Sequence, residues 1–186
     1  MKLLIVDDEK LTREGLCSSI DWESLGITEV AGADDGLNGI ATAKKNMPDI
    51  VLSDVRMPRM DGIRMCAELQ KMNPELCIIF MSGYSDKEYL KSAIRLKAVR
   101  YVEKPIEEEE VAEAVREAVR LVSSALVNKE KEQKSAQRET EILAEKLCQP
   151  GRVTEEELKR FVQTNPEKPC AFSLLIKIYH QSALSS

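Results

Sequence analysis

The amino-acid sequence predicts an α/β fold in which a parallel five-stranded sheet is followed by an extended C-terminal helix and a small α+β tail. Short uninterrupted apolar runs alternate with helical patterns as far as Pro105, as in consecutive βαβ units. Residues 106 to 148 contain no glycine or proline and are rich in Ala, Glu, Lys, Leu and Arg, which favours one long helix. All nine aspartates lie between Asp7 and Asp86, whereas residues 106 to 186 carry fifteen glutamates and no aspartate. The composition therefore divides the chain near residue 105.

Five short strands are predicted from the apolar runs. A parallel strand that is buried on both faces appears in the sequence as a continuous apolar segment. The segments are Leu3 to Val6, Val30 to Ala33, Ile50 to Leu52, Leu76 to Met81, and Tyr101 with Val102.

Four helices are predicted between and after these strands. Pro48 and Pro74 follow the second and third helices, and a proline disfavours helical geometry in the residue before it. The helical patterns are Leu11 to Ile20, Leu37 to Lys45, Ile63 to Met72, and Lys87 to Lys97.

The first half of the long predicted helix carries an apolar stripe suited to packing on the sheet and then on a partner. If the stripe continued as the heptad repeat of a coiled coil, Lys129, Glu132 and Glu139 would lie at the apolar positions between the helices. A coiled coil tolerates charged residues poorly at these positions. A solvated connector helix is therefore favoured over a dimerising coiled coil. Beyond Pro150, we expect a short helix capped by Thr154 and a strand from Ala171 to Tyr179. The stripe consists of Val111, Val115, Ala118, Val122 and Ala125.

Composition and charge exclude several classes of function. The 186 residues carry a net charge of −5 and only 4% aromatic residues, which argues against a large DNA-binding surface and against base-stacking platforms. The single histidine, His180, leaves histidine-based catalysis and histidine metal sites improbable. The five cysteines form no C-x-x-C pair, so packing roles in a reducing compartment are expected. Since no apolar run approaches the length of a membrane span, we expect a soluble, cytoplasmic protein.

Polar side chains gather at the predicted carboxyl ends of the strands, where an open parallel sheet collects its functional groups. They are Asp7 and Asp8, Asp54, Ser82 and Lys104. Clustered carboxylates repel one another unless a cation neutralises them, and their hard oxygens favour Mg²⁺. With the metal and Lys104 shielding an incoming anion, Asp54 could attack a phosphorus centre and form an acyl phosphate. Ser82 could then donate a hydrogen bond to the new phosphate.

These residues occur within motifs that resemble those of a bacterial response-regulator receiver domain over residues 1 to about 125. The motifs are Val6-Asp7-Asp8-Glu9, Asp54-Val55-Arg56-Met57-Pro58-Arg59-Met60-Asp61-Gly62, Met81-Ser82-Gly83 and Lys104-Pro105. The resemblance implies a flavodoxin-like (βα)5 fold with strand order 2-1-3-4-5. It also implies that Asp54 accepts a phosphoryl group from a phosphohistidine on a partner sensor histidine kinase.

The resemblance further assigns roles to single residues. Asp8, Asp54 and the backbone carbonyl of Arg56 are expected to ligate Mg²⁺, with Asp7 acting mainly through a water. Ser82 and Lys104 are expected to contact the phosphoryl group, Tyr101 to switch its rotamer, and the peptide before Pro105 to be cis. By contrast, the residues themselves suggest that Asp61 caps a helix, that Trp22 covers core, and that Cys17, Cys66 and Cys77 fill apolar faces.

A second, narrower resemblance concerns Ile20-Asp21-Trp22-Glu23-Ser24-Leu25-Gly26, which is similar to the receivers of regulators that end in an AraC-type DNA-binding domain. The expected organisation is a receiver over residues 1–125, a connector helix over 126–149 and, over 150–186, a fragment of a following domain or a tail. No helix-turn-helix pair follows in the sequence. A truncated chain is favoured over a gene product that lacks its output domain.

Three hypotheses of function result. The first is a phosphorylation switch that changes dimerisation or an output through the face of the fourth helix, fifth strand and fifth helix. The second is a Mg²⁺-dependent phosphohydrolase with an aspartyl-phosphate intermediate, which would need an acid two residues after Asp54, where Arg56 stands. The third is an interaction domain that works without phosphorylation.

Overall fold

The computed structural model describes residues 1–83, 93–147 and 156, and it confirms the predicted α/β architecture. Five parallel strands form one sheet in the order β2-β1-β3-β4-β5. The strands are β1 (Lys2–Val6), β2 (Glu29–Ala33), β3 (Ile50–Asp54), β4 (Cys77–Ser82) and β5 (Arg100–Glu103). The helices are α1 (Lys10–Ser19), α2 (Gly36–Lys45), α3 (Gly62–Met72) and α5 (Glu108–Leu147).

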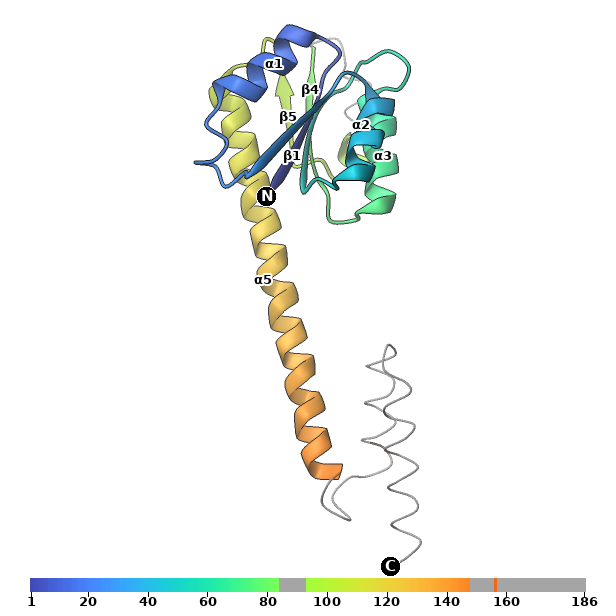
Figure 1. The fold of residues 1–186 in the computed structure, drawn as a ribbon, viewed down its shortest axis with the longest axis vertical. Coiled ribbons are helices and arrows are strands. Elements are labelled where there is room, and N and C mark those ends of the chain that lie inside the picture. The colour runs from blue at the N-terminus through green and yellow to red at the C-terminus, as the bar shows by residue number, and fades with distance from the viewer. Residues whose placement is uncertain (84–92, 148–155, 157–186) are drawn as a thin grey trace, which may run out of the picture. The chain divides into compact units, whose positions relative to one another are not determined.

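The sheet is covered on both faces, with α1 and α5 on one side and α2 and α3 on the other (Figure 1). Successive residues of a strand point to opposite faces, and β1 shows this directly. Leu3 and Ile5 pack toward α1 and α5, while Leu4 and Val6 pack toward α2 and α3. Burial on both faces explains why the strands appear in the sequence as continuous apolar runs.

The carboxyl ends of the strands lie at one edge of the sheet because all strand pairs are parallel. Asp54 of β3 is in register with Met81 of β4, and Ser82 is in register with Glu103 of β5. Asp7 continues from β1, and its backbone N–H donates to the Ala33 carbonyl at the end of β2. The fold therefore delivers side chains from β1, β3, β4 and β5 to one rim.

Asp61 and Trp22 have the structural roles that the sequence suggests. The Asp61 carboxylate accepts from the backbone N–H of Arg64 (2.7 Å) and caps α3. Trp22 is 6% exposed, and its Nε1 donates to the Leu16 carbonyl (3.0 Å). Both residues therefore stabilise the scaffold, as predicted.

The long helix α5 lies in both of the units into which the chain divides, Met1–Leu126 and Val127–Ser186. In the first unit, Val111, Val115 and Ala118 are fully buried in the cluster that covers the sheet. In the second unit, the side chains of residues 127–138 are exposed. Among the described helices, none combines the length and apolar character needed to cross a membrane.

Some predictions fall outside the described residues. Of the helix predicted from Lys87 to Lys97, only its final residues are described, and 93–95 are helical. The helix predicted after Thr154 is described at Glu156 alone. The strand predicted from Ala171 to Tyr179 and His180 lie outside the described range.

Candidate functional site

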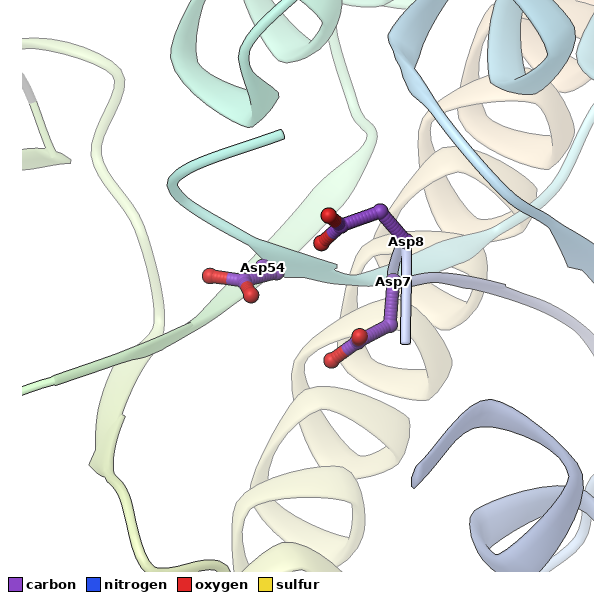
Figure 2. A group of neighbouring side chains, drawn as sticks. All are labelled: Asp7, Asp8 and Asp54. Carbon is purple, nitrogen blue, oxygen red and sulfur yellow. The ribbon is translucent and has the colours of Figure 1, made fainter. Parts of the chain in front are cut away.

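Three carboxylates gather at the rim of the sheet. Asp7 and Asp8 follow β1, Asp54 ends β3, and one oxygen from each lies within 4.8 Å of the others (Figure 2). Asp7 is fully buried and Asp54 is 7% exposed, whereas Asp8 is exposed. The group therefore has a buried base and one carboxylate that reaches solvent.

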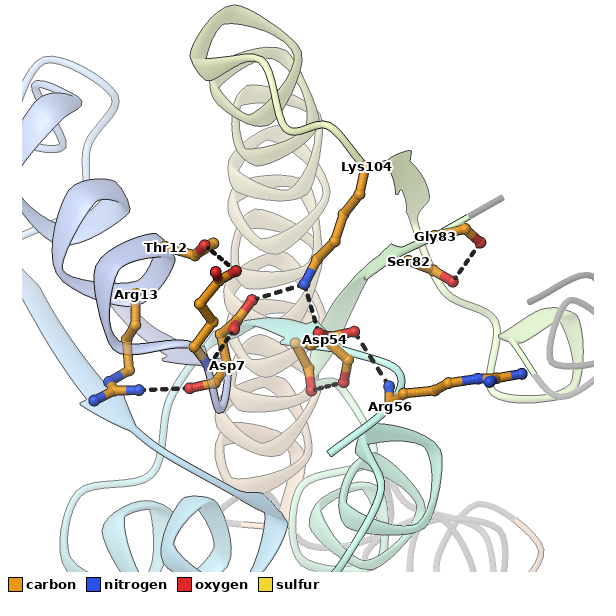
Figure 3. Close-up of polar contacts among 10 residues, drawn as sticks. Asp7, Thr12, Arg13, Asp54, Arg56, Ser82, Gly83 and Lys104 are labelled. Carbon is orange, nitrogen blue, oxygen red and sulfur yellow. Dashed lines mark hydrogen bonds and ion pairs between the residues drawn. The ribbon is translucent and has the colours of Figure 1, made fainter. Parts of the chain in front are cut away.

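Lys104 places a positive charge between the two buried carboxylates (Figure 3). Its Nζ lies 2.5 Å from Asp54 Oδ2 and 3.2 Å from Asp7 Oδ2. Its backbone N–H donates to the Ser82 carbonyl (2.8 Å), which anchors the residue beyond the end of β5. The Lys104–Pro105 peptide is cis, as the resemblance implies. One ammonium thus contacts carboxylates from two strands.

The electrostatics of the site follow from burial. Desolvation raises the pKa of Asp7, and the nearby charge of Asp54 adds to this, although the Glu9 N–H (2.8 Å) and Lys104 oppose it. Burial favours the neutral amine of Lys104, yet its contacts with Asp54 and Asp7 hold the pKa of that amine above its ordinary value. The ammonium of Lys104 is therefore held between the carboxyl groups of Asp7 and Asp54. When both carboxyl groups are ionised, their negative charge exceeds the positive charge of Lys104.

The donor set fits a small, hard divalent cation. Oxygen ligands with several waters retained are typical of Mg²⁺. Exposed Asp8 lines an open cavity of about 530 Å³ together with Arg56, Arg59, Asp61 and others, so waters have access on that side. Asp8 and Asp54 would hold the metal directly, and a cation there would offset the excess negative charge. The acidic cluster is thus suited to Mg²⁺.

Replacing Asp7 by asparagine should stabilise the metal-free protein. The folded pKa of Asp7 lies above its ordinary value of 3.8, so the folded state binds more protons and its stability falls as pH rises through that window. In EDTA at pH 7 we expect Asp7→Asn to raise the free energy of unfolding, because asparagine carries no charge that burial disfavours. Urea unfolding between pH 3.5 and 7 measures this, and the fall of stability with pH should shrink in the variant.

Saturating Mg²⁺ should reverse that order, because a ligand that binds only the folded state stabilises it. The wild type should gain more stability from the metal than Asp7→Asn does. A variant that is less stable than wild type in EDTA at every pH would contradict the assignment of Asp7 as an electrostatically costly group.

The remaining predicted site residues lie around this cluster. The Arg56 N–H donates to Asp54 Oδ1 (3.1 Å), while its side chain extends away from Asp54 (Figure 3). Ser82 is fully buried, and its Oγ donates to the Gly83 carbonyl (3.3 Å). Tyr101 is half-buried on β5 and packs against the core cluster that contains α3. The structure thus brings Asp7, Asp8, Asp54 and Lys104 together, with Ser82 on the adjoining strand end.

Two residues that shape the site were not assigned a role from the sequence. Arg13 Nη1 donates to the Asp7 carbonyl (2.6 Å), tying α1 to the end of β1. Gly62 lies so close to the Asp54 carbonyl that a Cβ there would overlap it. A signal for Gly62 existed in the Asp61-Gly62 pair, but it is equally typical of a turn. Arg13 lies on a solvated helix pattern, which gives no signal for a backbone contact.

Comparison with known proteins identifies the family to which the fold belongs. The family model of the response regulator receiver domain matches residues 3–116. The chain belongs to this family, which comprises receivers of two-component systems. A two-component transcriptional regulator AraC from Clostridium phytofermentans ISDg has a similar crystal structure, with 47% identity and a TM-score of 0.63, covering 69% of this chain and 98% of that chain. The predicted family, fold and strand order are therefore confirmed.

Other similar proteins carry names from transcriptional regulation. The receiver domain of AraT, a response regulator from Geobacillus stearothermophilus, is 33% identical with a TM-score of 0.59 and covers 69% of this chain and 97% of that one. The transcriptional regulatory protein YesN of Bacillus subtilis is 31% identical over 130 residues, which are 70% of this chain and 35% of YesN. HptR of Staphylococcus aureus is 31% identical over 106 residues, 57% of this chain and 41% of HptR. The chain thus spans about a third to two fifths of these curated relatives.

Proposed function

We propose that this receiver accepts a phosphoryl group on Asp54 and that Mg²⁺ is required for the transfer. The observation that carries the proposal is the placement of Asp54 at the rim, with its Oδ2 on Lys104 Nζ (2.5 Å) and its carboxylate beside Asp7 and Asp8. A nearly buried carboxylate that faces an ammonium and a cation site is suited to attack a phosphorus centre.

In the proposed transfer, an Asp54 oxygen forms a bond to phosphorus while the bond from phosphorus to the donor's histidine nitrogen breaks. The donor is a phosphohistidine on a sensor histidine kinase, and the leaving imidazole departs with the electron pair of the broken bond. Lys104 is released from the Asp54 carboxylate and pairs with an oxygen of the transferred group. When bound by Asp8, Asp54 and the Arg56 carbonyl, Mg²⁺ supplies charge neutralisation at the transferred oxygens.

Ser82 and Tyr101 act after the transfer in this proposal. The Ser82 Oγ, which donates to Gly83 (3.3 Å), turns to donate to the phosphoryl group. Tyr101 moves inward on β5 and shifts an existing conformational equilibrium. The output responds to this change at the face formed by the helix predicted from Lys87 to Lys97, β5 and α5. On this face, Arg100 of β5 pairs with Glu113 and Glu117 of α5.

A surface beside Lys104 is suited to hold the kinase during transfer. A cavity of about 440 Å³ is lined by Lys104, Pro105 and α1 residues that include Leu11, which is 80% exposed. Any protein donor must bring its phosphohistidine to Asp54, so it must contact the surfaces next to Lys104. The exposed Leu11 side chain at that point fits contact with a helical kinase segment.

The domain organisation and output are proposals of the same kind. We assign residues 1–125 to the receiver, 126–149 to a connector helix and 150–186 to a fragment of a following domain or a tail. The relatives are named as transcriptional regulators and are longer than this chain. We therefore propose that the parent protein is a cytoplasmic transcriptional regulator whose DNA-binding output domain lies outside these residues. Its dimerisation would respond to phosphorylation of Asp54.

Incubation with phosphoramidate, a small donor with a phosphorus–nitrogen bond, tests the proposal. With Mg²⁺, intact-mass spectrometry should show one added phosphoryl group per chain, and peptide mapping should place it on Asp54. EDTA should prevent the modification, and beryllofluoride should bind only when Mg²⁺ is present. Absence of both modification and beryllofluoride binding would overturn the proposal. Repeated turnover of phosphate esters would instead favour the phosphohydrolase hypothesis.

A further inference from the structure

The loop between β3 and α3 contains a turn that residues with side chains rarely adopt. Arg59 has a φ of 64°, and the N–H of Met60 donates to the Pro58 carbonyl (2.7 Å) across it. A three-residue turn of this kind, with a positive central φ, is strained for an L-residue. Contacts from outside the turn must therefore hold it in place.

One such contact is an ion pair with a buried carboxylate on the neighbouring loop. The Asp35 side chain is 2% exposed and pairs with the Arg59 guanidinium, while Asp34 lies 4.0 Å from the same guanidinium. Asp35 also caps α2 by accepting from the Asn38 N–H (2.8 Å). Because a buried carboxylate is costly without a partner, Arg59 and Asp35 each fix the position of the other.

A second contact joins the backbones of the two loops. The Gly36 N–H donates to the Met60 carbonyl (3.2 Å). A Cβ on Gly36 would lie only 2.7 Å from that carbonyl oxygen, so a side chain there would push the loops apart. We call these two contacts, Asp35–Arg59 and Gly36–Met60, the loop latch.

The latched loop is the one that carries Arg56. It begins at Asp54, where the Arg56 N–H donates to Asp54 Oδ1 (3.1 Å), and it ends where the Gly62 N–H donates to the Val55 carbonyl (3.0 Å). Arg56, Arg59 and Asp8 line the same cavity. The place of the Arg56 carbonyl therefore depends on the conformation of the turn at Arg59.

We propose that Arg59 is a positioning residue for the cation site, acting through its ion pair with Asp35 to hold the Arg56 carbonyl toward the carboxylates. The inference rests on the proposed Mg²⁺ site. The effect that it predicts for Mg²⁺ affinity when Arg59 is removed is opposite to the effect expected from the loss of charge alone. Removing a positive charge near a cation site should strengthen cation binding, whereas loss of the latch should weaken it.

Arg59→Gln and Arg64→Gln form a matched pair. Both remove one arginine from the same cavity wall, but Arg64 is 77% exposed and pairs with Asp61 on its own helix end (3.3 Å). Mg²⁺ titrations, followed by the Arg56 amide resonance and by calorimetry, should show about tenfold weaker binding for Arg59→Gln. Arg64→Gln should bind as tightly as wild type or slightly more tightly, and Arg59→Lys should recover most of the loss.

Two further variants distinguish positioning from general destabilisation. Asp35→Asn keeps the helix cap but removes the charge partner, and adding it to Arg59→Gln should weaken Mg²⁺ binding little further. Arg59→Gly accepts the turn without strain but lacks the ion pair, so it should remain folded and still bind Mg²⁺ more weakly. Urea unfolding in EDTA reports folding separately.

Unchanged or tighter Mg²⁺ binding by folded Arg59→Gln and Arg59→Gly would overturn the latch while leaving the proposed function intact. Wild-type protein that binds no Mg²⁺ would overturn the cation site, and the latch with it. Equal weakening by Arg64→Gln would show that the loss does not depend on the Arg59–Asp35 ion pair, and it would also contradict the proposal.

Discussion

Asp54→Asn is expected to accept no phosphoryl group from phosphoramidate or from a kinase. The amide keeps the shape of the side chain, but it lacks a nucleophilic carboxylate oxygen. Its single oxygen can accept from only one of the two donors, Lys104 or the Arg56 N–H, which lie on different oxygens of Asp54. The extent of phosphorylation should fall by at least about a thousandfold. Intact-mass spectrometry and gels that retard phosphoproteins both measure it.

Asp61→Asn is the matched control for this experiment. It makes the same chemical change in the same loop, and asparagine caps a helix about as well as aspartate, so α3 should keep its first turn. We expect phosphorylation of Asp61→Asn at close to the wild-type rate. Phosphoryl transfer to Asp54→Asn at a second residue would contradict the assignment. An Asp54→Asn protein indistinguishable from wild type in assembly and signalling would support the interaction-domain hypothesis.

Among the substitutions proposed for this protein, Gly62→Ala is expected to cause the largest loss of stability. A Cβ at Gly62 would overlap the Asp54 carbonyl oxygen and lie 2.5 Å from Ser53 Oγ, which itself donates to that carbonyl (2.8 Å). Since the obstructing atoms belong mostly to a central strand, the strand end or α3 must move. We expect a loss of about 3 kcal/mol in the free energy of unfolding, measured by urea denaturation in EDTA.

Gly15→Ala provides the contrast. Gly15 lies within α1, and a Cβ there meets nothing within 4 Å. Alanine should therefore raise the free energy of unfolding by about 0.5–1 kcal/mol through its helix propensity. Because the Gly62 clash is with Asp54 itself, Gly62→Ala should also slow phosphorylation and weaken Mg²⁺ binding, while Gly15→Ala should leave Mg²⁺ binding unchanged. Wild-type stability and Mg²⁺ affinity in Gly62→Ala would show that the loop yields easily.

The structure links stability and function at the carboxylate rim. Asp7 is placed where burial raises its pKa, and Lys104 offsets only part of the negative charge that Asp7 and Asp54 bring together. The same excess that is unfavourable in the metal-free protein favours a divalent cation. The receiver is therefore expected to lose some stability in exchange for affinity toward the metal that we propose its phosphorylation requires.

The sequence by itself determined the parts of this protein that depend on local pattern. Buried parallel strands require continuous apolar residues, so Leu3 to Val6 and Ile50 to Leu52 were located within a residue or two. The carboxyl ends of parallel strands share one edge, so Asp7, Asp8, Asp54 and Lys104 could be grouped before any distance was known. Capping by Asp61 was also predictable, because it depends on residues three positions apart.

Only the tertiary structure decided which long-range contacts hold the site. Three features depend on how the helices pack on the sheet, because each joins segments that are separate in the sequence. They are the Arg13 contact with the Asp7 carbonyl, the close approach of Gly62 to the Asp54 carbonyl, which leaves no room for a side chain, and the Asp35–Arg59 ion pair. An arginine on a polar helix face or in a turn has the same local pattern whether it is solvated or paired. Its role is fixed by the distance to a group far away in the chain, which local sequence pattern does not encode.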